Sequence, residues 1–392
     1  MKTKWCFGLV AFTWACWLWI GSDIRAGYSI ASDARQQQLE DASRLYLPVT
    51  GPCNPAFPRD HGPHPGFRNE WWYYTGNVQA ATGEHFGFQL TFFRRQISSP
   101  GSTSNWPQSP SDWRTDQIYF AHAALSEMSA SQFHQSEVLA RGAMNLAGSF
   151  QQQDTTTVFV GNWRLRCQGR EHHLRAASER FRMDLLLNAG KEPVAHGLAG
   201  YSRKGSTPEQ ASCYYSITRL TVSGTVAVGA SEIPVEGIAW MDHEYGSASL
   251  EPNLMGWDWF SLQLKDNTEL MLYLLRQEDG NNHPSSSGTY VDAGGQAHHL
   301  PADAFTVEVL DSWVSSTSGA RYPHRWRVRI PEFQLDLLVI PALDNQEMVT
   351  TRSACTTYWE GAVTVTGTNG SDGISGVGYV ELTGYAGPMR LE

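Results

Sequence analysis

Helical periodicity is nearly absent from this sequence of 392 residues, and Met128–Ala140 is the one segment whose spacing suits a helix of more than about two turns. Short alternating runs recur instead, separated by turn residues at loosely regular spacing. They include Thr156–Leu165, Phe181–Leu187, Tyr214–Val222 and Ile233–Met241. This pattern predicts an all-β chain of antiparallel strands, arranged as a sandwich or a barrel.

Charge is also scarce, since charged residues make up 17% of the chain and the net charge is −10. An acidic protein repels a phosphate backbone, so a nucleic-acid partner is excluded. Aromatic residues, in contrast, reach 12%, with 15 Trp. Packing volume alone does not require so many indoles, and large aromatic surfaces suit a cavity for an apolar small molecule.

Cysteine is limited to six residues, of which Cys6 and Cys16 lie in the N-terminal apolar segment. The other four are Cys53, Cys167, Cys213 and Cys355. In an oxidising compartment four cysteines can pair in three ways, and the sequence does not choose among them. Buried free thiols are the alternative, because a chain of this size needs no covalent cross-links.

The common catalytic spacings are missing as well. The nearest approach to G-x-S-x-G is Gly200–Lys204, which fails at its last position. H-E-x-x-H, C-x-x-C and P-loop motifs do not occur. These absences leave no sequence support for a nucleophile elbow, a zincin site or a nucleotide-binding loop.

Two β-hairpins organise what is present. Trp71–Thr75 and Phe86–Phe93 are strongly β-forming and are separated by turn residues, and an arginine pair follows them. A similar hairpin begins at Trp257, and when the two are superposed Arg94 falls on Arg276. An internal repeat at this distance predicts two similar β-domains in tandem.

The N-terminus has the order of a secretory signal peptide, with Lys2 and Lys4 followed by the apolar run Trp5–Ile20. We assign residues 1–26 to a signal peptide or an uncleaved anchor, and residues 27–54 to a linker. The N-terminal domain is expected at 55–235 and the C-terminal domain at 236–392, with the loop Ser98–Pro110 as a lid or flap. The protein is thus predicted to be exported to the periplasm or cell envelope, either free or anchored to the inner membrane.

The sharpest chemical cluster is Trp240–Gly246, WMDHEYG. In an extended strand Asp242 and Glu244 share one face with Trp240, and His243 points to the other. Neighbouring carboxyl groups against aromatic walls have raised pKa values and can donate protons near neutral pH. The alternative is that both acids are solvated at a strand end or paired with arginines.

Other polar residues allow the same two interpretations. Glu70 shares a face with Trp72 and Tyr74, as a second pocket carboxylate or as the partner of an arginine. His122 is an acid or base, or else a hydrogen-bonded core residue. The pair His172-His173 is expected to be solvated, and the segment Asp60–His64 offers half a metal site that nothing nearby completes. We predict no metal.

Several motifs resemble the AttH and carotenoid 1,2-hydratase family, whose members are also described as lipocalin-like or as predicted secreted hydrolases. The motifs are HPGFRNEWWYYTGN, FGFQLTFFR, YFAHAALS, GIAWMDHEYGS, GWDWFSLQL, ELMLYLLR, YWEGAV and GYVELTGYAG. The resemblance covers the chain from about Pro55 to its end. It implies two tandem lipocalin-like (calycin) antiparallel β-barrel domains, in agreement with the repeat.

The same resemblance implies water addition to an isoprenoid double bond without a redox cofactor, or an undefined role beside ABC-transporter components. By motif, the acidic residue of the hydratases falls on Asp242, with Glu244 as its neighbour. For a hydrolytic variant, His243 or His122 is the expected base. The expected substrate contacts are Glu70, Trp71, Tyr73, His122, Trp240, Trp257 and Tyr385.

Two functions therefore follow. In the first, the protein is an enzyme that adds water by acid catalysis to an apolar, isoprenoid or lipid-like ligand, with no cofactor. In the second, it is a non-catalytic lipid carrier that works with an envelope ABC transporter at a membrane surface. A barrel of about eight strands has room for one small ligand in either case.

Overall fold

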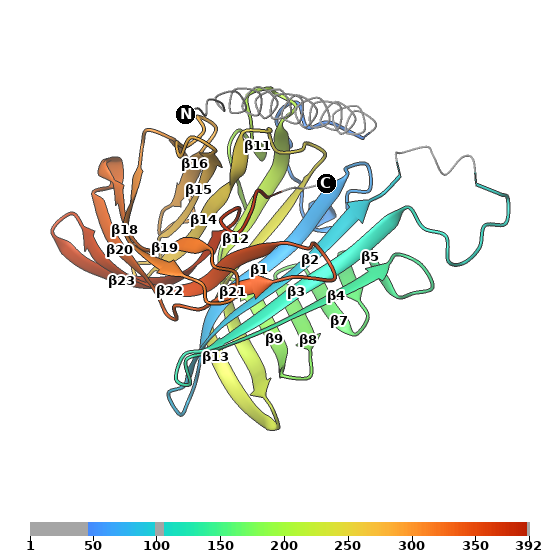
Figure 1. Cartoon of the computed structure of the whole chain (residues 1–392), viewed down its shortest axis with the longest axis horizontal. Coiled ribbons are helices and arrows are strands. Elements are labelled where there is room, and N and C mark those ends of the chain that lie inside the picture. Colours follow the sequence, from blue (N-terminus) through green and yellow to red (C-terminus); the bar gives the residue numbers. More distant parts are fainter. Residues whose placement is uncertain (1–45, 99–105, 390–392) are drawn as a thin grey trace, which may run out of the picture.

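The computed structural model describes residues 46–98 and 106–389, and the regular secondary structure within them is almost entirely β-strand (Figure 1). Two antiparallel sheets curl into a barrel and a half-barrel, which confirms the all-β prediction. Short 3-10 turns occur in this part of the chain, among them η1 (Arg59–His61) and η3 (Pro331–Phe333). The predicted signal peptide or anchor lies outside the described residues. Within them, no helix has the length and apolar character needed to cross a membrane.

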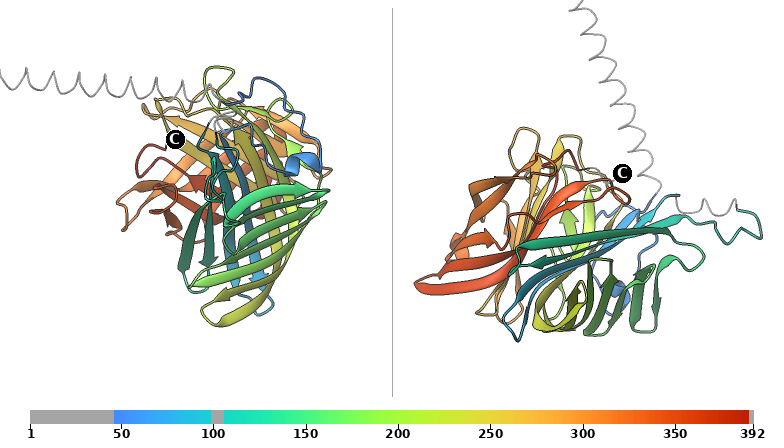
Figure 2. Two further views of the ribbon diagram at one scale, coloured as in Figure 1. Left: turned by 90° about the vertical axis from the view of Figure 1, so that its right-hand side faces the viewer. Right: turned by 60° about the horizontal axis from the view of Figure 1, so that its bottom comes forward.

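The first sheet contains thirteen strands in the order β4-β3-β2-β1-β13-β12-β9-β8-β7-β6-β5, with β10 and β11 also paired to β12. Its strands are β1 (Asn69–Ala80), β2 (His85–Gln96), β3 (Gln117–Glu127), β4 (Gln132–Arg141), β5 (Ala147–Gln152), β6 (Thr155–Val160), β7 (Trp163–Gln168), β8 (Glu171–Ala177), β9 (Phe181–Ala189), β10 (Val194–Ala195), β11 (Tyr201–Arg203), β12 (Ala211–Val228) and β13 (Ser231–Gly246). The β3–β4 end approaches β5 and β6, so the sheet closes around an apolar core (Figure 2).

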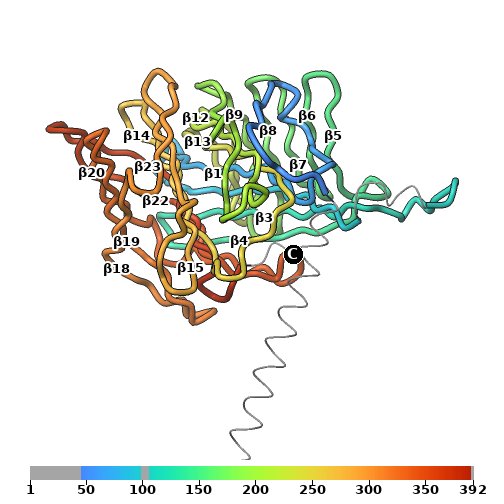
Figure 3. Tube along the Cα trace, turned by 90° about the horizontal axis from the view of Figure 1, so that it is seen from above, coloured from blue at the N-terminus to red at the C-terminus, as the bar shows by residue number. Residues whose placement is uncertain are grey.

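The second sheet has ten strands in the order β17-β16-β15-β14-β23-β22-β20-β19-β18, with β21 also paired to β22. Its strands are β14 (Leu254–Leu264), β15 (Glu269–Gln277), β16 (Ser287–Val291), β17 (Ala297–Pro301), β18 (Thr306–Val314), β19 (Arg321–Ile330), β20 (Leu335–Pro341), β21 (Glu347–Val349), β22 (Thr357–Asn369) and β23 (Asp372–Leu382). Seen from above, the two sheets stand side by side (Figure 3).

The two sheets meet through side chains, at β1 with β23, β2 with β22 and β12 with β14. At Gly87 the approach is so close that an added Cβ atom would lie 2.6 Å from the Cβ atom of Ala362. The β12 strand has an irregular register between Ile217 and Leu220, and there Gln263 of β14 donates to the Thr218 carbonyl oxygen at 2.8 Å. A polar side chain of one sheet thereby satisfies a backbone group that the irregularity of the other leaves unpaired.

A buried charge cluster also ties the sheets together. Glu269 of β15 is fully buried, and one of its carboxylate oxygens lies 2.7 Å from the Lys191 ammonium group. Its other oxygen accepts from Nε of Arg219 on β12. The Glu269 carboxylate of the second sheet therefore pairs with two cations, Lys191 and Arg219, of the first sheet.

Several expectations need correction. Met128–Ala140 is a turn followed by most of β4, so the helix prediction is wrong. His172 is fully buried on β8 and bonds the Tyr74 hydroxyl at 2.7 Å, so it is not solvated. The expected domain boundary at 235/236 falls inside β13, which pairs with β1 and β12 of the first sheet.

The N-terminal connection is held more firmly than a linker. Tyr46 and Val49 are buried, and Cys53 forms a disulfide with Cys213, while Cys167 and Cys355 are free thiols. The described end of the 27–54 segment therefore packs against the first barrel.

Candidate functional site

Strand β13 carries two chemically different faces. Trp240 packs in the apolar cluster between the sheets, and its neighbour Met241 packs inside the first barrel. Asp242 and Glu244 follow Trp240, whereas His243 follows Met241, as the alternation of a strand requires. The two acids thus face the second sheet and the imidazole faces the barrel interior.

Asp242 is 4% exposed and is surrounded by donors. The Trp240 indole N–H donates to it at 2.6 Å, the Tyr214 hydroxyl donates at 2.7 Å, and the Ser216 hydroxyl donates as well. Burial raises the pKa of Asp242 to about 7, with Glu244 adding to the rise and the three hydrogen bonds opposing it. Asp242 therefore exchanges a proton near neutral pH.

Glu244 is charge-paired beside it. The Lys204 ammonium lies 3.2 Å from the Glu244 carboxylate, and the Ser212 hydroxyl donates to the same oxygen at 2.5 Å. Lys204 also sits over the Tyr273 ring, 4.2 Å from its centroid. The nearby Glu244 carboxyl group thus adds to the rise in the pKa of Asp242.

The second sheet contributes two further acids to the same interface. Glu360 of β22 and Glu381 of β23 are directly opposite each other in the strand pairing. The Trp257 indole donates to Glu381 at 2.7 Å, and burial raises the pKa of Glu381 to about 7, with the charges of Asp242 and Glu244 adding to the rise. Burial, reinforced by Glu381, raises the pKa of Glu360 well above its usual range. We call Asp242, Glu244, Glu360 and Glu381 the acid cluster.

Three buried polar groups near the acid cluster have no hydrogen bond of good geometry among the described residues: the carboxyl oxygens of Glu360 and the hydroxyls of Tyr73 and Tyr379. Buried polar groups are normally paired, since an unpaired one costs about 1–3 kcal/mol. Tyr73 and Tyr379 belong to the apolar cluster between the sheets, and Glu360 is 1% exposed. Unpaired donors and acceptors at one place are what a bound substrate or water would satisfy.

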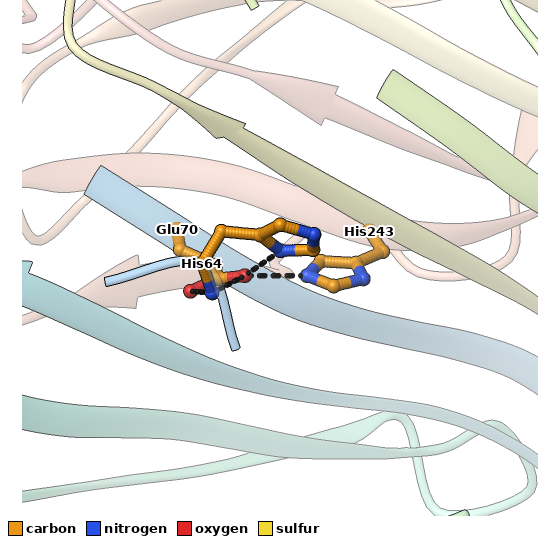
Figure 4. Close-up of side chains that lie close together, drawn as sticks. All are labelled: His64, Glu70 and His243. Carbon is orange, nitrogen blue, oxygen red and sulfur yellow. Dashed lines mark hydrogen bonds and ion pairs between the residues drawn. The ribbon is translucent and has the colours of Figure 1, made fainter. Parts of the chain in front are cut away.

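Glu70 and His243 belong to a different network, on the barrel side of β13 and β1. One Glu70 carboxylate oxygen lies 2.8 Å from Nδ1 of His64 and 2.9 Å from Nε2 of His243 (Figure 4). Arg94 is buried and donates to the other oxygen at 2.8 Å. The second hairpin has a corresponding pair, in which Arg276 donates to Asp258 at 2.8 Å. Glu70 was expected to be either a second pocket carboxylate or the partner of an arginine. In the structure it is the partner of Arg94.

His64, Glu70 and His243 could also hold a metal ion, because their ligand atoms lie within 4.8 Å of one another. Both ring nitrogens, however, point at a single carboxylate oxygen rather than around a shared centre. Arg94 already balances the carboxylate charge. The geometry is that of a hydrogen-bonded cluster, in which Glu70 and His243 lie beside His64 of the segment Asp60–His64.

The remaining predicted residues do not all lie at the acid cluster. Trp71, Tyr73, Trp240 and Trp257 lie in or against the apolar cluster between the sheets. His122 is buried and bonds the Tyr358 hydroxyl at 2.8 Å. Tyr385 lies apart from the acid cluster, with its hydroxyl 3.0 Å from Asp258.

Sequence reasoning missed Glu360 and Glu381, together with the tyrosines Tyr214, Tyr358 and Tyr379. Both glutamates lie in motifs that carried the family resemblance, YWEGAV and GYVELTGYAG. Their neighbours Trp359 and Val380 are fully buried core residues, so each glutamate is on the opposite face of its strand. The sequence pattern that could have identified both glutamates is an acidic residue that alternates with core residues in a β-forming run.

Two surface pockets lie away from the acid cluster. One of about 720 Å³ is lined by the disulfide, Asp60, His64 and Tyr245. The other, of about 620 Å³, is lined by Trp113, Leu139 and Arg141 among others. Neither pocket is lined by a residue of the acid cluster. The candidate site is therefore defined by the polar groups described above and not by a surface pocket.

Comparison with known proteins gives a consistent picture. A family model described as AttH-like matches residues 48–385. Among solved structures, a Nitrosomonas europaea protein provisionally designated AttH is 34% identical, with a TM-score of 0.76 over 86% of this chain and 99% of that one. The crystal structure of kievitone hydratase from Nectria haematococca has a TM-score of 0.65 over 88% and 98% of the two chains, at 16% identity, which is a likeness of fold.

Two curated proteins are also similar. Kievitone hydratase of Fusarium solani subsp. phaseoli is 25% identical over 209 residues, and dehydratase asqC of Emericella nidulans is 22% identical over 206 residues. These alignments cover 53% and 51% of this chain, and 58% and 57% of the two relatives. The chain thus matches somewhat more than half the length of the curated relatives.

Proposed function

The chain belongs to the AttH-like family, and we propose from this membership and from the acid cluster that it adds water to, or removes water from, an apolar substrate held between its two sheets. The observation that carries the proposal is the meeting of proton-exchanging acids from both sheets with the unpaired groups of Glu360, Tyr73 and Tyr379. The names of its relatives, a hydratase and a dehydratase, point to the same class of reaction.

Hydration of an alkene needs a proton donor, a site that tolerates a cation, and a base for the attacking water. Protonated Asp242 donates its proton to one alkene carbon, and the other carbon becomes cationic. The faces of Trp240 and Trp257 stabilise that cation by roughly 0.5–2 kcal/mol each. A carboxylate such as Glu381 then takes one proton from the water whose oxygen bonds to the cation, so that alkene and water give an alcohol with no net loss of protons.

Hydration fits the geometry better than ester hydrolysis does. The two imidazoles considered as hydrolytic bases are His243 and His122. His243 faces the barrel interior, on the side of β13 opposite to Asp242, and both of its ring nitrogens have partners. His122 is bonded to Tyr358 and to Ser353, so neither of its ring nitrogens is free for a water beside Asp242.

The test begins with native mass spectrometry and lipid extraction of the purified protein, which identify any captured apolar compound. That compound, or an isoprenoid alkene if none is captured, is then incubated with the protein in H₂¹⁸O. Incorporation of ¹⁸O that is lost in Asp242→Asn and retained in the surface variant Asp336→Asn supports the proposal. A compound that is bound but never gains or loses water refutes it and favours the lipid carrier.

We also propose that the protein works outside the cytoplasm, in the periplasm or cell envelope. The disulfide between Cys53 and Cys213 supports this, because such bonds persist in oxidising compartments. Fractionation of the native host, with thiol labelling before and after reduction, tests the location and the disulfide together. Recovery of the reduced protein in the cytoplasm would refute it.

A further inference from the structure

A line of hydrogen bonds runs from the interior of the interface to a carboxylate near the surface. Nδ1 of His122, on β3, lies 2.8 Å from the Tyr358 hydroxyl of β22. Nε2 of the same ring lies 2.8 Å from the hydroxyl of Ser353, in the segment between β21 and β22. Ser353 in turn donates to a carboxylate oxygen of Glu137 on β4. The line therefore crosses between the two sheets.

The outer end fixes the direction of every hydrogen in the line. Glu137 accepts the backbone N–H groups of Thr351, Arg352 and Ser353 at 2.8, 3.1 and 2.9 Å, in addition to the Ser353 hydroxyl. An ionised carboxylate only accepts, so Ser353 must donate to it. It follows that His122 donates from Nε2 to Ser353 and accepts at Nδ1 from Tyr358.

The charge states along the line agree with that order. Burial lowers the pKa of His122 to about 4, so the ring is neutral at pH 7 and has one N–H. Although burial opposes it, hydrogen bonding from Ser353 and the backbone holds the pKa of Glu137 at about 2. The line therefore consists of three neutral donors that end at an anion, and Arg352 is the cation beside that anion.

The inner end lies at the acid cluster. Tyr358 and Glu360 are two residues apart on β22 and project from the same face. Within the described residues, neither Glu360 carboxyl oxygen has a hydrogen bond of good geometry, so the first proton transfer requires the Glu360 carboxyl group to turn toward the Tyr358 hydroxyl on the same face of β22. Because Glu360 is 1% exposed, its proton has no direct path to solvent.

We propose that Tyr358, His122 and Ser353 form a proton relay between Glu360 and Glu137. This inference rests on the proposed function for its purpose: Glu381 takes a proton from the water, its cross-strand neighbour Glu360 receives that proton, and the relay carries it away between turnovers. Glu360 passes a proton to the Tyr358 oxygen, Tyr358 to Nδ1, Nε2 to the Ser353 oxygen, and Ser353 to Glu137. Tyr358, His122 and Ser353 each gain one proton and lose one, Glu360 loses one and Glu137 gains one, so nothing is oxidised or reduced, and the reverse sequence reloads Glu360.

A nucleophilic Ser353–His122 pair is the competing interpretation of the same contacts. It would require the Ser353 hydroxyl to donate to Nε2, but that proton is bonded to Glu137. It would also require backbone N–H groups to stabilise an oxyanion. The three N–H groups nearest to Ser353 donate to Glu137 instead, so the contacts favour the relay.

The experiment follows hydrogen–deuterium exchange of the Glu360 carboxyl by stopped-flow infrared spectroscopy of the full chain, without substrate. The carbonyl band of protonated Glu360 is identified as the band that disappears in Glu360→Gln. After mixing into D₂O, we expect this band to exchange about tenfold or more slowly in His122→Phe than in the native protein, and more slowly also in Ser353→Ala. The matched control, His298→Phe, changes a partly exposed histidine outside the line and should exchange at the native rate.

Native-rate exchange in Ser353→Ala and His122→Phe would overturn the relay, and so would the absence of a Glu360 band at pH 7. Ser353 is only partly buried, so its alanine variant keeps the test possible even if His122→Phe does not fold. Because the measurement needs no substrate, a failure of the proposed hydration leaves its result unchanged. Conversely, loss of the relay with ¹⁸O incorporation intact would leave the proposed function standing.

Discussion

Substitution of Glu269 by glutamine tests whether the two sheets depend on the charge cluster that joins them. The carboxylate is fully buried and contacts Lys191 at 2.7 Å and Arg219 through Nε. Glutamine has nearly the same shape but no charge, and its amide N–H groups would face two cations. Lys191 and Arg219, with side chains 7% and 16% exposed, would then lack their counter-charge.

Breaking a buried ion pair by removing one partner typically costs about 3–5 kcal/mol, most of it from the charge left behind. One carboxylate serves two cations here, so we expect Glu269→Gln to fall within that range. For domains of this size it corresponds to a fall in Tm of about 6–20 °C. Because the cluster joins the two sheets, the loss should also separate their unfolding into two transitions.

Differential scanning calorimetry and urea unfolding at low ionic strength would measure both effects. The matched control is Asp336→Asn, which removes a carboxylate 2.6 Å from Arg327 where both side chains are at least a third exposed. Such surface pairs contribute about 0–1 kcal/mol. If Glu269→Gln costs no more than this control, the buried cluster does not hold the sheets together.

Three further predictions concern the acid cluster and the disulfide. Asp242→Asn should lower the rate of water addition by about 10²–10⁴-fold while the circular dichroism spectrum remains native; a rate within twofold of native would exclude Asp242 as the proton donor. Because burial raises the pKa of Asp242 to about 7, the folded state binds a proton that the unfolded state releases above its ordinary pKa near 4, so stability falls as pH rises from about 4 to 7. Between pH 5 and pH 8 the native protein should therefore lose about 2–3 kcal/mol more than Asp242→Asn in urea titrations, and parallel curves would contradict the raised pKa. Replacing Cys53 and Cys213 together by serine should lower stability by about 2–5 kcal/mol, and reductant should destabilise the native protein but not this variant.

Local patterns in the sequence were sufficient to predict where the strands lie and which side chains share a face. The β-forming residues of Trp71–Thr75 and Phe86–Phe93, with turn residues between them, predicted the first hairpin, which the structure has as β1 and β2. Period-two alternation also separated Asp242 from His243 correctly, because side-chain direction in a strand is fixed by the backbone. The repeated hairpin likewise indicated a second, similar sheet.

Local sequence patterns could not predict which strand faces meet across the molecule. The opposition of Glu360 and Glu381 depends on strand pairing, and their approach to Asp242 depends on how the two sheets pack. His172 looked solvated in its sequence context, yet barrel closure places it against Tyr74. The predicted domain boundary at 235/236 lies inside β13, because this strand continues past that point and pairs with β1 along the whole length of β1.

The acid cluster draws its carboxyl groups from two sheets that share no strand, so its acid strength depends on the distance between them. Coulomb repulsion between carboxylates falls as their separation grows, and water that enters a wider gap removes the cost of burial. A small opening of the interface would lower the pKa values of Asp242, Glu360 and Glu381 together, and closure would raise them together. Proton affinity in this molecule is thereby coupled to mechanical displacement, and a ligand that wedges the sheets apart or draws them together would set how readily the acids release their protons.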